Sequence, residues 1–306
     1  MINLMNGNCL ELMKTIPDGS VDLILTDPPY GMINGLNGVD WDNLIDLDIM
    51  WSEINRVLRL NGKCILFSQN YFTFELLKTS LPNIPCLYRA IWKKDTFGNA
   101  LLCNKALVSE FEDICIFQKK YILERGYNKD NPAFSYLKSE KEKRGITTKE
   151  FNLMYSAYTG KIKNPNRSIL ARSWETSQFM IPLPDVYENV LQNTGFFNKP
   201  YSELKNENDD FINKSKPVFN IWDGGKYKSN VFEYKKDYSG LHPTQKPVAL
   251  LEDLIKTYSN IGDMVLDFTC GSGSTLVAAK NTNRHAIGIE LDETYFQIAK
   301  ERIENA

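Results

Sequence analysis

A strand, a glycine-rich turn, a helix and a second strand follow one another near the C-terminal end of the chain. Apolar residues 264–266 predict the first strand, residues 274–281 the helix, and residues 285–289 the second strand. A helix that connects two neighbouring strands is the usual connection in a parallel sheet with both faces covered. This unit therefore restricts the chain to an α/β fold.

The N-terminal part shows the same alternation. Residues 21–26 (VDLILT) are typical of a buried strand, and residues 49–60 have apolar residues at helical spacing. We expect Asn61-Gly62 to end this helix. Further strands are expected at residues 63–67, 86–92 and 112–117, and further helices at residues 247–258 and 293–303.

Residues 119–241 lose this alternation. They are rich in Lys, Asn, Ser, Tyr and Pro, so we expect an irregular insertion between two parts of one domain, residues 1–118 and 242–306. The insertion carries 21 of the 36 Lys and Arg but 15 of the 38 Asp and Glu. Such a basic segment suits a polyanion such as nucleic acid, although a solvated lysine-rich surface explains the charge equally well.

The six cysteines are scattered, with no CxxC pair and no histidines at ligand spacing, so neither a zinc site nor a disulfide framework is indicated. No apolar run approaches the roughly 20 residues that span a bilayer. The N-terminus lacks the basic start and apolar core of a signal peptide. The sequence predicts a soluble, cytoplasmic protein without a metal centre.

The glycine-rich turn reads DFTCGSGST, and we call residues 267–275 the glycine loop. Gly271 and Gly273 allow a ligand to approach the backbone closely at a helix N-terminus. Glu290 ends the next strand, where its carboxylate can accept hydrogen bonds from ribose hydroxyls. The third glycine of a dinucleotide fingerprint is absent, and Asp267 would repel a pyrophosphate. S-adenosylmethionine, with its positive amino end, therefore suits the loop better than NAD.

A second motif, DPPYG, directly follows the strand at residues 21–26. Neither Pro28 nor Pro29 can donate a main-chain N–H, so the chain leaves the sheet at the edge where open α/β sheets bind ligands. Asp27 and the Pro28 carbonyl offer two acceptors, and Tyr30 offers a flat ring. These groups suit the amino group of a planar base, which has two N–H donors. We therefore predict a catalytic DPPY ledge, formed by Asp27, Pro28, Pro29 and Tyr30.

The DPPYG motif, HPTQKP at residues 242–247 and LDFTCGSGST at residues 266–275 together resemble the motifs of DNA amino-methyltransferases that use S-adenosylmethionine. Their order is similar to that of the permuted beta group, in which a target-recognition segment separates the catalytic motif from the cofactor loop. The resemblance implies a Rossmann-like methyltransferase fold with permuted motif order. It also implies that a strand at residues 2–5 lies beside the strand at residues 285–289.

The resemblance further implies which residues lie at the cofactor. Asn8 and Cys9 would lie against its adenine, Pro243 and Thr244 beside its methionine part, and Lys246 could equally be a solvated residue at a helix start. The full expected set is Asn8, Cys9, Asp27, His242, Pro243, Thr244, Lys246, Asp267, Phe268, Thr269, Gly271, Ser272, Gly273, Ser274, Thr275, Glu290 and Leu291.

Asp at the first position of DPPY resembles the adenine-N6 enzymes, whereas cytosine-N4 enzymes more often carry Ser. The sequence therefore predicts methyl transfer to adenine N6 in duplex DNA, after the base has been flipped out. Charge alone makes Lys161, Lys163, Arg167 and Arg172 candidates for contacting the DNA.

Several alternatives stay open at this point. They are a cytosine-N4 DNA methyltransferase, a methyltransferase that acts on RNA or a protein amide, a nucleic-acid-binding module without catalysis, and an NAD oxidoreductase. The intact DPPY ledge disfavours a binding module without catalysis. The missing third glycine disfavours an NAD oxidoreductase. A cognate restriction endonuclease and a homodimer also stay open as partners besides DNA.

Overall fold

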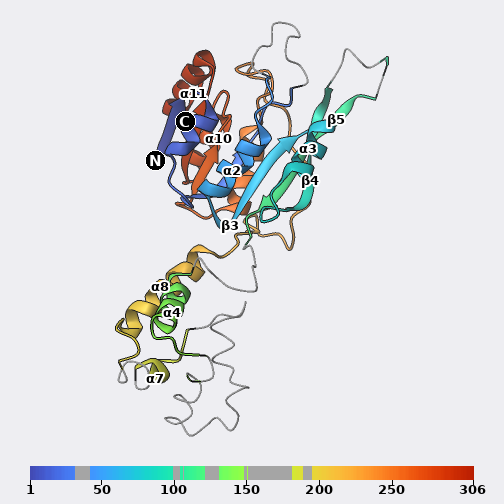
Figure 1. Ribbon diagram of the computed structural model, residues 1–306. Helices are drawn as coiled ribbons and strands as arrows, with labels where there is room; N and C mark the ends of the chain where they lie inside the picture. The colour runs from blue at the N-terminus through green and yellow to red at the C-terminus, as the bar shows by residue number, and fades with distance from the viewer. Residues whose placement is uncertain are drawn as a thin grey trace. The chain divides into compact units, whose positions relative to one another are not determined.

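The computed structural model describes residues 1–31, 42–98, 104–105, 107–120, 131–147, 150, 181–188 and 195–306 (Figure 1). The chain forms two compact units. The first, which we call the sheet unit, consists of residues 1–120 and 217–306. The second, the helical unit, consists of residues 121–216.

Within its described residues, the sheet unit contains one eight-stranded sheet in the order β1-β8-β7-β2-β3-β5-β4-β6. The strands from β1 to β3 in this order are parallel, β5 is antiparallel to both β3 and β4, and β6 pairs in parallel with β4. The N-terminal strand lies beside β8, as the family resemblance implied. The bounds are β1 (Ile2–Asn6), β2 (Val21–Thr26), β3 (Leu58–Ser68), β4 (Cys86–Gly98), β5 (Ser109–Gln118), β6 (Val231–Glu233), β7 (Met264–Asp267) and β8 (His285–Glu290).

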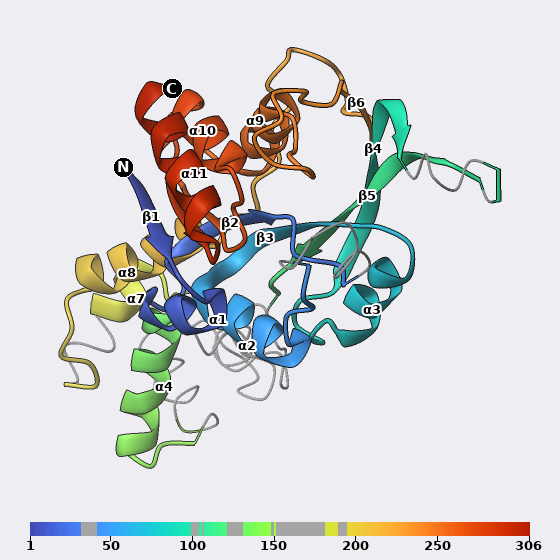
Figure 2. The ribbon, with the colours of Figure 1, turned by 90° about the horizontal axis from the view of Figure 1, so that it is seen from above.

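Helices cover both faces of this sheet (Figure 2). Because side chains alternate along a strand, Leu23 and Leu25 of β2 pack with α9 and α10, whereas Ile24 packs with α2. Within the described ranges, every helix lacks the length or the apolar character needed to cross a bilayer. The helices are α1 (Cys9–Leu12), η1 (Met13–Thr15), α2 (Leu47–Val57), α3 (Tyr71–Thr79), α9 (Val248–Tyr258), α10 (Ser274–Asn281) and α11 (Glu293–Asn305).

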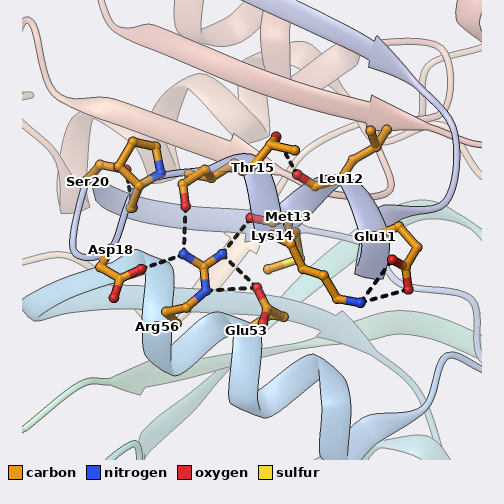
Figure 3. A network of polar contacts seen from close by, with 11 residues as sticks. Glu11, Leu12, Met13, Lys14, Thr15, Asp18, Ser20, Glu53 and Arg56 are labelled. Atoms are coloured by element: carbon orange, nitrogen blue, oxygen red, sulfur yellow. Dashed lines mark hydrogen bonds and ion pairs between the residues drawn. The ribbon is translucent and has the colours of Figure 1, made fainter.

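An arginine of α2 fixes the segment that leads into β2. Arg56 Nη1 donates to the carbonyl of Ile16 at 2.7 Å and to Asp18 at 2.6 Å. Its Nη2 donates to the carbonyl of Met13 at 2.6 Å and to Glu53 at 2.7 Å (Figure 3). These bonds give partners to main-chain carbonyls at the end of the first helical segment, where intrahelical donors run out. They tie the approach to β2, and so to the DPPY ledge, to helix α2, which buries one face against the sheet.

The prediction that Asn61-Gly62 ends a helix was wrong. Helix α2 ends at Val57, and Asn61-Gly62 lies inside β3, where Asn61 has a positive φ of 58°. The pairing of β3 with β2 shifts register between Val21 and Leu23, so the Asn-Gly pair lies in an irregularity of a strand. Pairing with β2 and burial of Leu58 outweigh the local helical pattern.

The described part of the helical unit contains regular helices within the insertion that the sequence predicted to be irregular. It contains α4 (Pro132–Lys143), α7 (Pro184–Val186) and α8 (Tyr201–Lys214) in its described part. These helices enclose a small core, in which the rings of Tyr187 and Phe197 stack at 5.1 Å between centroids. The Asn131 side chain donates to Asn208 at 2.9 Å and so links the start of α4 to α8.

The helical unit ends at residue 216, whereas the composition of the sequence predicts that the insertion ends at residue 241. The difference arises because residues 217–241 include β6, in which Val231 pairs with Ile91 of β4. A strand of three residues has too little periodicity to be recognised in the sequence.

Candidate functional site

The DPPY ledge and the glycine loop lie together at one edge of the sheet. Strands β2 and β7 are parallel neighbours, so the segments that follow them leave the sheet side by side. Two side chains join these segments. Thr269 Oγ1 donates to the main-chain oxygen of Asp27 at 3.1 Å, and Thr26 Oγ1 donates to Asp267 Oδ1 at 2.7 Å. Residues far apart in the chain therefore form one continuous site.

Asp27 is held from two sides. The Tyr30 hydroxyl donates to its Oδ1 at 2.6 Å, and Lys246 Nζ donates to its Oδ2. Burial raises the pKa of Asp27 above its usual value, although the charge of Lys246 opposes the shift. Each carboxylate oxygen has more than one lone pair, so Asp27 can still accept bonds from a ligand.

Lys246 lies between two carboxylates. Its Nζ is 3.2 Å from Glu112 Oε2, and Glu112 Oε1 is 2.5 Å from Lys94 Nζ. Burial by itself lowers the pKa of Lys246, but Asp27 and Glu112 together hold that pKa above its usual value. Lys246 thus lies at the ledge and is not a solvated residue at a helix start; its side chain is only 6% exposed.

The ring of Tyr30 is backed by a second ring. It stacks on Phe72 of α3 with 5.0 Å between centroids and an interplanar angle of 27°. Burial raises the pKa of the Tyr30 hydroxyl well above its usual value, so the hydroxyl stays a donor to Asp27. The ledge therefore presents a ring whose tilt is fixed by the fold.

Asp267 is buried beneath the loop. Its Oδ1 accepts from Thr26 and from the main-chain N–H of Thr269 at 3.2 Å, and burial raises its pKa to about 6. Sequence reasoning expected Asp267 to face the positive end of a ligand, but its described bonds hold β7 to β2. Phe268 is 1% exposed and packs in the core.

The glycine loop turns through two residues with positive φ, Gly271 at 52° and Gly273 at 78°. Glu290 supports this turn: its Oε2 accepts from the N–H of Gly271 at 2.7 Å and its Oε1 from the N–H of Asp292 at 2.8 Å. Burial raises the pKa of Glu290. A lone pair on each oxygen is left for a ligand's hydroxyls.

The HPTQKP segment packs against the glycine loop. A Cβ added at Gly271 would lie 3.5 Å from the His242 ring, whose edge meets Tyr295 of α11 at 4.3 Å between centroids. Burial lowers the pKa of His242 to about 4, so the ring is neutral at pH 7. Ser272 Oγ donates to Gln245 at 3.0 Å, while Pro243 and Thr244 are exposed.

The other expected cofactor residues lie around the same loop or on β8. Ser272, Ser274 and Thr275 are buried, and Arg302 of α11 donates to the Ser272 carbonyl at 2.8 Å. Leu291 follows β8 and is 68% exposed.

Asn8 and Cys9 begin α1, just after β1. Asn8 Oδ1 accepts from the N–H of Leu10 at 2.9 Å and so caps the helix. Burial raises the pKa of the Cys9 thiol to about 11, so it is uncharged at neutral pH. The Asn8 oxygen is thus partly used within the protein.

Sequence reasoning missed Glu112, Phe72, Gln245 and Tyr295. Gln245 was within reach, because it belongs to the HPTQKP motif. The acidic pair Glu112-Asp113 at the start of an apolar strand is an unusual local signal, but nothing in the sequence pairs it with Lys246. Phe72 and Tyr295 look like ordinary apolar residues of amphipathic helices.

The four basic residues suggested for DNA contact, Lys161, Lys163, Arg167 and Arg172, lie outside the described residues. Within the described part of the helical unit, α4 carries Lys138, Lys141 and Lys143.

Comparison with known proteins identifies related chains. The family model N6_N4_Mtase, described as DNA methylase, matches residues 21–301. The DNA adenine methyltransferase YhdJ of Escherichia coli (strain K12) is 28% identical over 315 residues, which cover 99% of this chain and 83% of YhdJ.

Two solved structures share the fold. The M1.HpyAVI–SAM complex aligns with a TM-score of 0.54 at 20% identity over 99% of this chain and 100% of the other. The PvuII DNA methyltransferase (cytosine-N4-specific) aligns with a TM-score of 0.54 at 13% identity over 98% of this chain and 86% of the other. The predicted Rossmann-like α/β fold is confirmed.

Proposed function

Because the chain belongs to the N6_N4_Mtase family of DNA methylases, we propose that it transfers the methyl group of S-adenosylmethionine to the N6 amino group of adenine in duplex DNA. One observation carries the proposal: the DPPY ledge adjoins the glycine loop, and Thr269 bonds directly to Asp27. The similarity to an adenine methyltransferase and to a chain solved with SAM supports it.

The residues around the glycine loop fit this cofactor. Gly271 and Gly273 keep the backbone open to close approach, and the Glu290 carboxylate retains lone pairs for ribose hydroxyls. The neutral His242 ring beside the loop adds no positive charge near a sulfonium. S-adenosylmethionine supplies an electrophilic methyl group when it is bound there.

The DPPY ledge would orient the amine that attacks this methyl group. One N–H of the amine donates to the Asp27 carboxylate and the other to the Pro28 carbonyl, while the base stacks on Tyr30. With both donors engaged, the nitrogen lone pair turns out of the plane of the base and towards the methyl group. This orientation would let the nitrogen form the N–C bond as the S–C bond of the bound cofactor breaks, and Asp27 or water would take up the amine proton.

Cytosine N4 is the second candidate target, because it presents the same two N–H donors and the chain shares its fold with a cytosine-N4 enzyme. Asp at the first ledge position favours adenine. Nucleoside analysis of methylated DNA separates N6-methyladenine from N4-methylcytosine directly. Sequencing the methylated positions in DNA from expressing cells identifies the recognition sequence.

Replacing Asp27 with Ala tests whether this residue acts in methyl transfer and not in binding of the cofactor. The variant is expected to lose methyl transfer to duplex DNA by at least about a hundredfold, because one of two acceptors for the amine is gone. Its affinity for S-adenosylmethionine, measured by calorimetry, should stay within about threefold of the wild type, since Asp27 bonds to the loop only through its main chain.

Glu290→Gln is the matched variant at the other side of the site. It should weaken cofactor binding, because it removes the charge that favours ribose hydroxyls. Full transfer activity in Asp27→Ala, or no N6-methyladenine from the wild-type protein, would contradict the proposal.

A further inference from the structure

Four charges of alternating sign form a row at the ledge: Lys94, Glu112, Lys246 and Asp27. Lys94 and Lys246 are each 6% exposed, Glu112 is 13% exposed and Asp27 is 21% exposed. The row runs from β4 through β5 to the segment before α9 and ends at the residue that we propose as acceptor for the target amine. Its net charge is zero when all four groups are ionised.

Stability alone is a poor reason for such a row. Removing charges from water costs free energy that their mutual attraction only partly returns, so buried ion pairs are often no better than apolar residues. The position of Glu112 is also unfavourable for Asp27, because a second carboxylate beyond Lys246 repels it. Because Glu112 is unfavourable for the charge of Asp27, the row is better explained by the chemistry that we propose for Asp27 than by stability.

Lys246 has two opposite effects on Asp27. Without the ammonium, a buried Asp27 would take up a proton, and the resulting O–H could not accept from an amine as a carboxylate does. An ammonium with Asp27 as its one anionic partner would compete more strongly with the target amine for the Asp27 oxygens. Glu112 Oε2, 3.2 Å from Lys246 Nζ, is a second carboxylate within ion-pair distance, so the charge of the ammonium is shared between Asp27 and Glu112.

We propose that Lys246 and Glu112 are positioning residues for Asp27: Lys246 keeps the Asp27 carboxylate ionised, and Glu112 gives the ammonium a second carboxylate, so that Asp27 does not hold its whole charge. This inference rests on the proposed function. It gives Lys246 a role at the acceptor of the target base instead of at the cofactor, and it adds Glu112, which no motif contains. Lys94 anchors Glu112 from β4.

The titratable groups that act on Asp27 come from several elements. They are Tyr30 on the ledge, Lys246 before α9, Glu112 on β5 and, through the shared edge, Asp267 at the end of β7. His242 lies near Lys246 and is neutral above about pH 4. Because these groups titrate together, the fall in kcat/KM at low pH, which we call the acid limb, reflects the protonation of the whole cluster and not of Asp27 alone. The informative quantity is therefore the direction in which a substitution shifts this limb along the pH axis.

The test compares the pH dependence of kcat/KM for duplex DNA in wild type, Lys246→Met and Glu112→Gln. Loss of the ammonium should move the acid limb to higher pH and lower kcat/KM at pH 7 by about tenfold or more. Loss of the Glu112 charge should move the same limb to lower pH, because a like charge near Asp27 disappears. It should also raise KM for DNA more than it lowers kcat, because the ammonium, left with Asp27 as its one carboxylate partner, competes more strongly with the target amine.

Controls separate this role from general damage to the fold. Lys228→Met removes another buried, paired lysine, which bonds to Asp253 of α9, and should leave the acid limb in place. In Lys246→Arg, the acid limb should lie closer to its wild-type position than in Lys246→Met, because Arg keeps the positive charge. If Lys246→Met does not fold, Glu112→Gln still decides, since its expected shift has the opposite sign.

The inference would be overturned if the acid limb of the kcat/KM profile keeps its position in Glu112→Gln. It would also be overturned if the limb shifts in the same direction along the pH axis in Lys246→Met and Glu112→Gln. A wild-type protein that methylates no DNA would instead overturn the proposed function, so the two failures are distinguishable.

Discussion

At the scale of single residues, Asp267 shows how the site depends on a buried charge. Asp267 is 4% exposed, and the Thr26 hydroxyl and the Thr269 N–H only partly replace the hydration of its carboxylate. Its pKa is therefore about 6, compared with 3.8 for an exposed aspartate. Between these two values the folded protein binds a proton that the unfolded chain does not.

The sign of the resulting pH dependence follows from linkage. Because Asp267 has the higher pKa in the folded state, its contribution to the free energy of unfolding increases as the pH falls from about 7 to about 4. The gain has an upper limit of about 3 kcal/mol. Urea unfolding at several pH values should show this gain in the wild type and not in Asp267→Asn. Parallel curves of the free energy of unfolding against pH in the wild type and in Asp267→Asn would contradict this role of Asp267.

At the scale of elements, the connection from β7 to α10 is fixed by a close contact with α11. Gly273 has a φ of 78°, and a Cβ added there would lie 2.9 Å from the Cβ of Ala299. Helix α10 therefore starts where only glycine is both unstrained and small enough. The approach of α11 to the glycine loop depends on that residue.

Gly273→Ala should lower the free energy of unfolding by about 2–3 kcal/mol, from backbone strain and overpacking together. Gly262→Ala is the matched control, because Gly262 has a φ of 85° but open space around it. It should cost only the backbone strain, about 1 kcal/mol. Chemical unfolding measures both, and equal losses would show that the contact with Ala299 does not matter.

At the scale of the whole molecule, the chain combines an acidic sheet unit, with 21 Lys and Arg against 26 Asp and Glu, with a weakly basic helical unit, with 15 Lys and Arg against 12 Asp and Glu. If the helical unit binds DNA phosphates, reversing charges on α4 should weaken binding and make its salt dependence shallower. Lys138, Lys141 and Lys143 changed together to Glu should reduce the slope of log K against log salt by roughly one for each lost phosphate contact.

Reversal of Lys14, Lys78 and Lys300 in the sheet unit changes the net charge equally and is the control. A slope that changes as much in this control as in the α4 variant would mean that net charge, and no particular surface of the helical unit, governs binding.

The sequence by itself determined the elements whose pattern is local. The strand at residues 21–26 and the helix at residues 274–281 were predicted to the residue, because a short apolar run and a glycine turn before a helix each act within a few residues. The DPPY ledge and the glycine loop were also recognisable, since prolines and glycines act through the backbone they occupy.

Only the tertiary structure decided which charges meet. Lys246 reaches both Asp27 and Glu112, and Asn61-Gly62 lies within a strand, because sheet pairing brings together segments that are far apart in the chain. Contacts of this kind leave no periodic signal in either partner's neighbourhood. The free energy of burying a charge depends on all its neighbours at once, and these are defined only when the sheet has formed.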